Sequence, residues 1–141
     1  MMIRPNPRET YGNIDIYLFD QLLKGTYAQC TTILDAGCGA GRNLMYFLNS
    51  GYHVFGVDKS EQAISQLRKT ATGCPLISPE ENFLVSAVEN LPFGNEKFDL
   101  VISSAVLHFA ENLEHFELML DSMWRVLKPG VYFFCRRAGN T

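Results

Sequence analysis

The stretch that decides the fold of this chain is Leu34-Asp35-Ala36-Gly37-Cys38-Gly39-Ala40-Gly41-Arg42-Asn43, followed by Val54-Phe55-Gly56-Val57-Asp58. An apolar segment leads into a turn with glycine at every second position, and a second apolar segment ends in a carboxylate. This order predicts a buried strand, a tight turn, a helix and a second strand. Units of this kind build parallel sheets covered by helices.

Glycine at positions 37, 39 and 41 has a physical reason. A chain that turns sharply beside a ligand has no room for Cβ atoms and often needs positive φ, which glycine adopts at low cost. We expect the backbone N–H groups of this turn, and of a helix beginning near Gly41, to face a crevice. Asp58 ends the next strand in reach of that crevice, where a carboxylate accepts hydrogen bonds from both hydroxyls of a ribose. The pattern is typical of sites for adenosine-bearing cofactors.

The glycine spacing separates two cofactor classes. Dinucleotide-binding loops have glycine at the first, third and sixth positions, but the sixth position here is Arg42. The pattern is instead Asp35-x-Gly37-x-Gly39-x-Gly41, and it resembles the first motif of the class I S-adenosylmethionine-dependent methyltransferases. An NAD(P)-dependent oxidoreductase is the less favoured alternative.

Further segments resemble the same family at the expected places. They are Val54–Asp58 for the ribose-binding strand, Glu89-Asn90-Leu91-Pro92-Phe93 for the loop beside the adenine, Phe98–Ser104 for the fourth strand, and Leu127-Lys128-Pro129-Gly130 for the turn before the fifth. The resemblance runs from about Ile33 to Arg136. It is strongest to small-molecule methyltransferases whose fourth strand leads into a Leu-His pair, here Leu107-His108.

The resemblance implies a set of residues that bind S-adenosyl-L-methionine. Asp35 and the carbonyls around Gly37 would meet its amino acid end, Asp58 its ribose, and Ala87–Glu89 its adenine. The full set is Asp35, Gly37, Cys38, Gly39, Gly41, Asn43, Asp58, Lys59, Ala87, Val88, Glu89, Ser103 and Ser104, with Ser103 or Ser104 on the methionine side. Many relatives carry an aspartate where this chain has Ala87, so adenine selectivity must rest on backbone groups or on Glu89.

Methyl transfer needs a nucleophile held about 3 to 3.5 Å from the methyl carbon in a site closed to water. The cofactor supplies the electrophile, so neither a catalytic triad nor a metal is expected. His108 follows strand 4 on the ligand side and is the candidate general base, with a packing or capping role as the alternative. Tyr11 and Tyr17 could close over the cofactor, although core packing is favoured for Tyr17.

Periodicity predicts a doubly wound, mostly parallel α/β sheet of strand order 3-2-1-4-5 in one domain at 13–141, after a flexible arm at 1–12. We expect strands at Thr31–Asp35, His53–Asp58, Asn82–Ala87, Phe98–Ser103 and Val131–Arg136. Helices are expected at Ile14–Leu23, at Arg42–Asn49, after the N-cap Ser60, and at Leu113–Leu127, with a loop at Gly73–Glu81. Trp124 and the methionines of the last helix are expected in the core, and His115 on its exposed side.

The family's sheet continues with strands 6 and 7, which the sequence lacks after strand 5. Strand 5 would then be an apolar edge, which natural proteins normally cover. We therefore expect a truncated or abridged domain whose edge is covered by the arm or by a second copy in a homodimer.

Composition limits the partners. A net charge of −3 without a run of Lys or Arg argues against nucleic acid, and no apolar run approaches the roughly 20 residues of a membrane span. The four cysteines show no CxxC pair, which favours reduced thiols in the cytoplasm, and Cys38 is expected to be a small residue under the turn. The favoured function is methyl transfer to a small-molecule acceptor, and the alternative is a non-catalytic S-adenosylmethionine-binding module.

Overall fold

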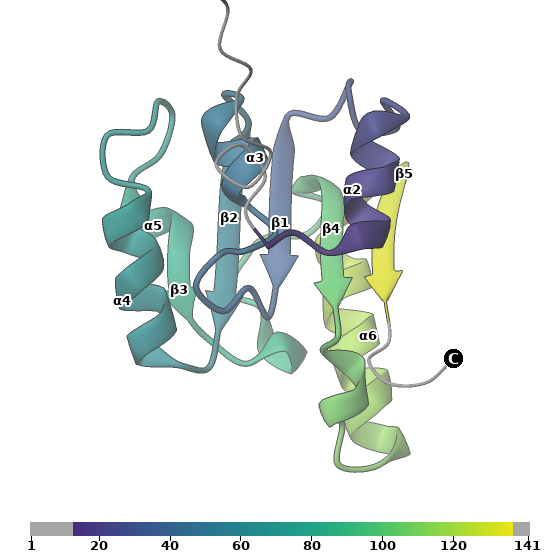
Figure 1. Ribbon diagram of the computed structural model, residues 1–141. Coiled ribbons are helices and arrows are strands. Elements are labelled where there is room, and N and C mark those ends of the chain that lie inside the picture. Colours follow the sequence, from purple (N-terminus) through teal and green to yellow (C-terminus); the bar gives the residue numbers. More distant parts are fainter. Residues whose placement is uncertain (1–12, 137–141) are drawn as a thin grey trace, which may run out of the picture.

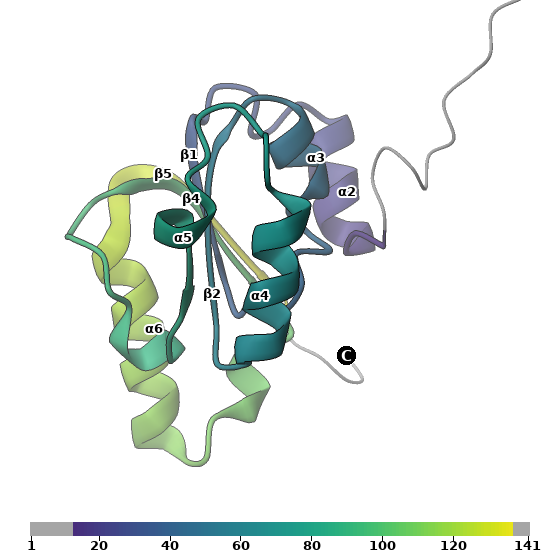
Figure 2. The same cartoon turned by 90° about the vertical axis from the view of Figure 1, so that its left-hand side faces the viewer.

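The computed structural model describes residues 13–136, which form a five-stranded sheet with helices on both faces (Figures 1 and 2). The strand order is β3-β2-β1-β4-β5 and every neighbouring pair is parallel. The strands are β1 (Thr32–Ala36), β2 (His53–Asp58), β3 (Phe83–Val85), β4 (Phe98–Ser104) and β5 (Leu127–Arg136). The predicted doubly wound sheet and its order are confirmed.

The helices form two unequal layers. Figure 2 shows the sheet nearly edge-on, with α2, α3 and α4 on one side and α6 on the other. Their bounds are α2 (Ile16–Leu23), α3 (Met45–Asn49), α4 (Glu61–Thr70) and α6 (Leu113–Val126), with the short helix α5 (Pro79–Asn82) and the 3₁₀ turns η1 (Val88–Asn90) and η2 (Leu107–Phe109). The predicted N-cap of α4 is confirmed, since the Ser60 side chain accepts a hydrogen bond from the backbone of Ala63.

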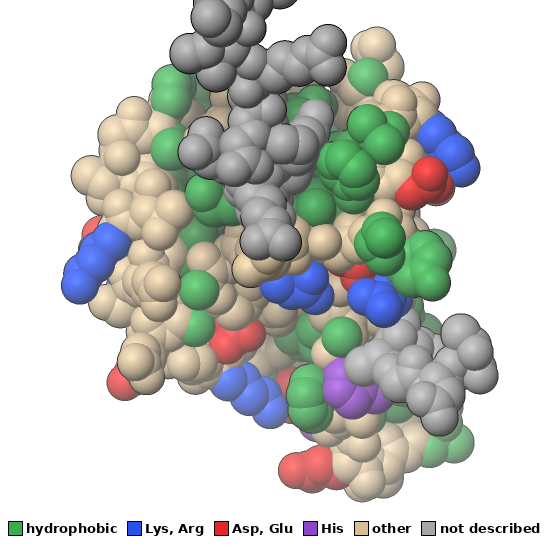
Figure 3. Space-filling model, viewed as in Figure 1, with side chains coloured by type: hydrophobic (Ala, Val, Ile, Leu, Met, Phe, Trp, Pro, Cys, Tyr) green, Lys and Arg blue, Asp and Glu red, His purple; other side chains and the backbone are tan. Residues whose placement is uncertain are grey.

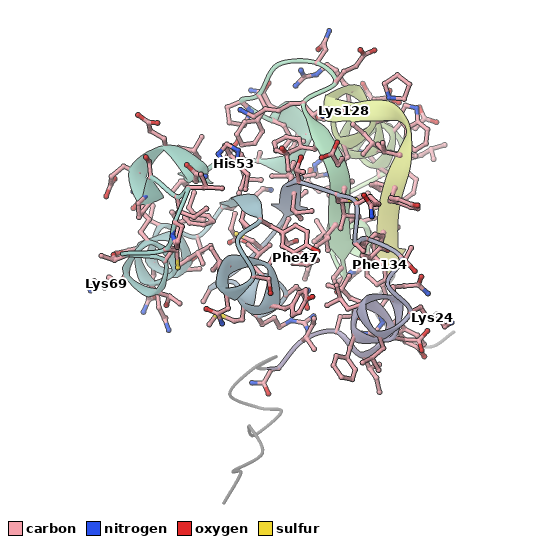
Figure 4. The ribbon with its side chains drawn as sticks, turned by 90° about the horizontal axis from the view of Figure 1, so that it is seen from above. Lys24, Phe47, His53, Lys69, Lys128 and Phe134 are labelled. Atoms are coloured by element: carbon pink, nitrogen blue, oxygen red, sulfur yellow. The ribbon has the colours of Figure 1, made fainter. Side chains whose placement is uncertain are left out.

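Successive residues of each strand point to opposite faces, so the sheet separates two cores. Ile33 and Ile102 pack toward α2, α3 and α4, whereas Leu34 and Val101 pack toward α6. Figure 4 shows Phe47 of α3 and Phe134 of β5 in the layer between the first group of helices and the sheet. The strands are thereby fixed from both faces, and only their ends remain open for a ligand.

Several predicted boundaries are wrong, most by one or two residues and three by more. The helix expected from Arg42 begins at Met45, because Gly41 is left-handed and residues 41–44 form a turn closed by a bond from Leu44 N–H to Gly41 O. Strand 3 was expected at Asn82–Ala87 but comprises only Phe83–Val85. Residues 79–82, which were expected to end the loop and begin this strand, form the helix α5 instead. The last helix ends at Val126 and β5 follows directly, so residues 127–130, which were predicted to form a turn before a strand beginning at Val131, belong to β5.

Two aromatic side chains expected in the core are exposed instead. Tyr17 is 57% exposed, with the Arg136 guanidinium 5.0 Å from its ring centre. Trp124 is 63% exposed and meets Phe133 edge-on. The methionines Met119 and Met123 of the same helix are buried as predicted. The buried face of α6 is narrower than the apolar stripe in its sequence, because α6 contacts the sheet along one side only.

The expected arm at 1–12, with Tyr11, lies outside the described residues, and the division at residue 13 stays a prediction. Within residues 13–136 no disulfide joins the four cysteines, and no group of three or more His, Cys, Asp or Glu side chains could hold a metal ion. In the same range, no helix combines the length and apolarity needed to cross a bilayer.

Candidate cofactor site

The three glycines of the turn after β1 are all left-handed, with φ of +83° at Gly37, +55° at Gly39 and +93° at Gly41. A Cβ on Gly37 would lie 2.5 Å from Val106 Cγ2, and one on Gly41 would lie 2.6 Å from Leu67 Cδ1. Beside Gly39, a Cβ would meet nothing within 4 Å. Positions 37 and 41 therefore require glycine for packing as well as conformation, while Gly39 borders open space.

The Asp58 carboxylate faces this turn. Its Oδ1 accepts a hydrogen bond from the Gly39 backbone N–H at 3.1 Å, and its Oδ2 accepts one from the Ser60 N–H at 2.9 Å. The Gly37 and Cys38 N–H groups both donate to Val57 O at 2.8 Å, which fixes the turn against the end of β2. The turn and the acidic end of β2 thus meet at one place, and each carboxylate oxygen retains a lone pair for a ligand.

A cavity of about 370 Å³ opens beside this pair. Figure 3 shows charged and histidine side chains around a hollow in the lower part of the face that is drawn, where the strands end. The lining residues come from four strand ends, the 3₁₀ turns and α6: Gly37, Asp58, Lys59, Ser86, Val88, Glu89, Ser104, Ala105, Val106, Phe109, His115 and Met119. The cavity lies where the strand order reverses between β1 and β4, which is the usual ligand position in doubly wound sheets.

The cavity brings together six of the predicted binding residues, namely Gly37, Asp58, Lys59, Val88, Glu89 and Ser104. The remaining ones lie behind or beside its wall. Asp35, Cys38, Gly41, Asn43 and Ser103 are buried, and Gly39 and Ala87 are partly exposed. His108 is exposed and does not line the cavity, but its ring centre lies 4.0 Å from that of Phe109, which does.

Asp35 is buried below the glycine turn, and its Oδ1 has no hydrogen-bond partner among the described residues. Burial raises the pKa of this carboxyl to about 7, the Arg42 charge opposes the shift, and the Asp58 charge adds to it. The side chain therefore exists in both protonation states near neutrality. A buried acceptor without a donor is costly, and a cationic ligand group would favour its ionised form.

We expect the Asp35→Asn variant to be more stable than the parent chain above pH 7 and about equally stable near pH 4. The folded-state pKa of Asp35 lies above the ordinary value of 3.8, so the folded state binds the proton more tightly and stability is lost as pH rises from about 4 to 7. The expected gain is on the order of 4 kcal/mol, because the pKa rises from 3.8 to about 7 and each unit corresponds to roughly 1.4 kcal/mol. Urea unfolding of both proteins at pH 4.5 and 8 measures it, and equal differences at both pH values would contradict it.

Asn43 and Ser104 contribute to a buried polar cluster that attaches α2 to the strand ends. The Asp15 N–H donates to Asn43 Oδ1 at 2.7 Å, while Asp15 Oδ2 accepts from Ser104 Oγ at 2.8 Å and from Arg136 at 2.9 Å. Asp15 is 1% exposed, and its Oδ1 caps α2. Burial would raise the pKa of Asp15, but the bonds from Arg136, Ser104 and the backbone of α2 outweigh it and lower the pKa.

Cys38 has the small-residue role that was favoured from the sequence. Its thiol is buried, donates to Gly39 O at 3.3 Å, and fills the space that a Cβ on Gly56 would enter, 2.9 Å from the sulfur. Burial, with the charges of Asp35 and Asp58, raises the pKa of the thiol, so it stays protonated. These contacts make Cys38 a packing residue between the turn and β2.

His115 is the main residue of the cavity that sequence reasoning missed. It was expected on the exposed side of α6, yet it is partly buried, and its Nε2 lies 2.8 Å from Glu89 Oε2. The signal was present in the spacing of His115, Met119 and Ser122, which places them on one side of a helix. All three side chains face η1 or the cavity, as their contacts show.

Fold and site together define a doubly wound α/β domain with a cavity at the carboxyl ends of its strands. A model of the methyltransferase domain family matches residues 34–135. The chain is 33% identical over 101 residues to an uncharacterised methyltransferase of Synechocystis sp., covering 72% of this chain and 44% of that protein. It is 30% identical over 123 residues to the malonyl-[acyl-carrier protein] O-methyltransferase of Salmonella typhimurium, covering 86% and 45%.

A solved structure shows the same arrangement. The SAM-dependent methyltransferase of Methanosarcina mazei superimposes with a TM-score of 0.67 at 27% identity, over 79% of this chain and 54% of that one. The chain belongs to the methyltransferase domain family, as its turn and strand order indicated. It spans less than half the length of the two sequence relatives described above.

Proposed function

We propose that this chain binds S-adenosyl-L-methionine in the cavity and forms the cofactor-binding part of a methyltransferase. The observation that carries the proposal is the meeting of Asp58 with the glycine turn, joined by the bond from Gly39 N–H. Open space beside Gly39 leaves room for a nucleoside, and Asp58 retains acceptor capacity for its two hydroxyls. The Asp35 carboxyl is buried behind the glycine turn, and its charge, when ionised, would favour the cationic amino acid end.

The residues of this chain would act by positioning and by excluding water. The bound cofactor supplies an activated methyl group. Val88, Val106 and Met119 give the cavity an apolar wall that excludes water, whereas Asp58 and Gly37 fix the orientation of the ligand. Lys59 and Glu89 complete the polar side.

The acceptor is proposed to be a small molecule. The net charge of −3 and the absence of a Lys or Arg run disfavour nucleic acid as the acceptor. The Salmonella relative is named for malonyl-[acyl-carrier protein], so an acyl carboxylate is one candidate acceptor. We also propose that the protein is located in the cytoplasm and that a second copy of the chain covers the edge of β5.

Calorimetric titration tests the cofactor assignment. We expect micromolar binding of S-adenosylhomocysteine and no binding of NAD at the same concentration. Binding of NAD alone would favour the oxidoreductase alternative and overturn the assignment. Methyl release to a panel of acceptors then separates an enzyme from a non-catalytic binding module.

The general base proposed at His108 is tested in the same assay. The His108→Ala variant is expected to lose about a hundredfold in transfer rate while its affinity for S-adenosylhomocysteine stays unchanged, since general-base catalysis contributes roughly that much. His53→Ala is the matched control, because His53 is an exposed histidine at the opposite end of the sheet. An unchanged rate in His108→Ala would show that the ring only packs on Phe109.

A further inference from the structure

The segment that follows β4 combines two costly features at the edge of the cavity. Ala105 is left-handed, with φ of +58°, a backbone conformation that residues with a Cβ rarely adopt. Phe109 is 72% exposed, a fraction that no other large apolar side chain among residues 13–136 exceeds. Both residues line the cavity. Backbone strain and an uncovered aromatic ring at the same place point to a ligand that would make use of them.

The left-handed turn at Ala105 fixes the start of this segment on two sides. The Ala105 N–H donates to Arg136 O at 2.7 Å, which ties the segment to the end of β5. The next side chain packs on the glycine turn, because Val106 Cγ2 lies only 2.5 Å from the place where a Cβ on Gly37 would be. The turn at Ala105 thus directs the chain from the end of the sheet over the turn that follows β1.

The ring of Phe109 is held in place by the 3₁₀ turn η2. The Phe109 N–H donates to Val106 O at 3.0 Å, and the Ala110 N–H donates to Leu107 O at 3.1 Å. Leu107 anchors the turn, since it is 5% exposed and packs in the core on the α6 side of the sheet. The His108 ring packs against Phe109, with ring centres 4.0 Å apart and planes inclined by 38°. An exposed ring that is already oriented binds a ligand at a lower entropic cost.

The two ends of the cavity differ in chemistry. At the end formed by β2 and η1, the lining carries the charged side chains of Asp58, Lys59 and Glu89. At the end formed by β4 and η2, the lining residues between positions 104 and 109 are uncharged, and Val106 and Phe109 are the large ones. Figure 3 shows hydrophobic and histidine side chains next to each other on the face with the hollow. The proposed function places the ribose against Asp58, which leaves the apolar end for the acceptor.

We propose that Phe109 contacts the methyl acceptor and selects one that carries an aromatic ring. The inference rests on the proposed function, because it assumes that the cofactor occupies the rest of the cavity. An aromatic acceptor would cover the exposed ring of Phe109, and both rings would leave water. The strain at Ala105 then has a role, since it turns the segment that carries Phe109 over the cavity. An acyl carboxylate has no ring to pack on Phe109 and is the less favoured acceptor.

The test titrates the chain, saturated with S-adenosylhomocysteine, with two probes of the same skeleton. They are 2-naphthol and decahydro-2-naphthol, in which both rings are saturated. Calorimetry gives the ratio of the two affinities. In Phe109→Leu this preference for the aromatic probe is expected to fall about three- to tenfold, which is what a pair of aromatic rings contributes beyond apolar contact. Phe109→Tyr retains an aromatic ring and is expected to keep the parent ratio.

Leu118→Ala is the matched control, because Leu118 is an exposed apolar residue of α6 that does not line the cavity, and it should leave both affinities unchanged. Thermal melts verify that every variant is folded, and each variant is titrated with S-adenosylhomocysteine first.

Four results would contradict the inference. If Phe109→Leu leaves both affinities unchanged, Phe109 does not touch the acceptor, and the cofactor site stands. If Phe109→Leu weakens both probes by the same factor, the contact is apolar without being aromatic, and an aliphatic acceptor replaces the aromatic one. If the parent chain binds S-adenosylhomocysteine but neither probe, the inference fails alone. If it does not bind S-adenosylhomocysteine, the proposed function and the inference fail together.

Discussion

Replacing Asp58 with alanine is expected to weaken the binding of S-adenosylhomocysteine by about 3 kcal/mol, roughly a hundredfold. The variant would lose the acceptor for both ribose hydroxyls, and bonds to a charged acceptor are the stronger ones. It would also lose the bond from Gly39 N–H at 3.1 Å that holds the glycine turn against β2. The two losses act together, because a turn that moves also displaces the backbone groups beside the ligand.

Calorimetry on the parent chain, Asp58→Ala and Asp58→Asn measures this effect. The asparagine variant should fall between the other two, since one side-chain oxygen remains to accept a hydrogen bond. Glu61→Ala serves as the control, because Glu61 is an exposed acidic residue in the first turn of α4, three positions away. A dissociation constant that Asp58→Ala leaves unchanged would show that the ribose is held elsewhere.

Replacing Asp15 with alanine is expected to lower the free energy of unfolding by about 2 to 4 kcal/mol. The carboxylate caps α2 and accepts bonds from Ser104 and Arg136, so its removal costs a helix cap, of about 1 kcal/mol, and leaves a buried hydroxyl without its acceptor. Because these contacts keep the folded-state pKa of Asp15 below 3.8, their contribution is full above about pH 5 and is lost as pH falls through 3.8 and below.

Urea unfolding of the Asp15→Ala variant at pH 7 and pH 3 checks both parts of this prediction. The difference from the parent should be largest at pH 7 and smaller at pH 3. Asp20→Ala is the control, since Asp20 forms an exposed pair with Lys24 on the same helix and such pairs contribute well under 1 kcal/mol. Equal destabilisation by both variants would mean that Asp15 acts only as a surface charge.

The sequence was sufficient for those parts of the site that depend on local chemistry. Left-handed backbone at Gly37, Gly39 and Gly41 follows from residue type, and the position of Asp58 follows from the period of a strand. Strand order followed from the handedness of parallel connections and from resemblance to a known family. These features involve contacts between neighbouring motifs, which a sequence pattern describes well.

Contacts between distant residues could not be predicted in this way. Asp15 meets residues 28, 89 and 121 positions further along the chain, and no local pattern marks such a pairing. Asn43 and Ser104 were predicted to bind the cofactor, and they also have a structural role. Asn43 accepts a hydrogen bond from the Asp15 backbone N–H, and Ser104 donates one to the Asp15 carboxylate. Helical periodicity predicted the wrong exposure for His115 and Trp124. The period shows which residues of α6 share a face, but it does not show how much of that face the rest of the fold covers.

The attachment of α6 to the segment at residues 88–93 has a practical consequence. Trp124 is the one tryptophan of the chain, and it lies on α6 between Ser122 and Arg125, the two side chains that hold Leu91. Its indole is largely exposed and touches Phe133 of β5, so its emission is sensitive to small shifts of the helix against the sheet. If a ligand in the cavity shifts α6 against the sheet, intrinsic fluorescence will report it without a label, from the opposite end of the helix.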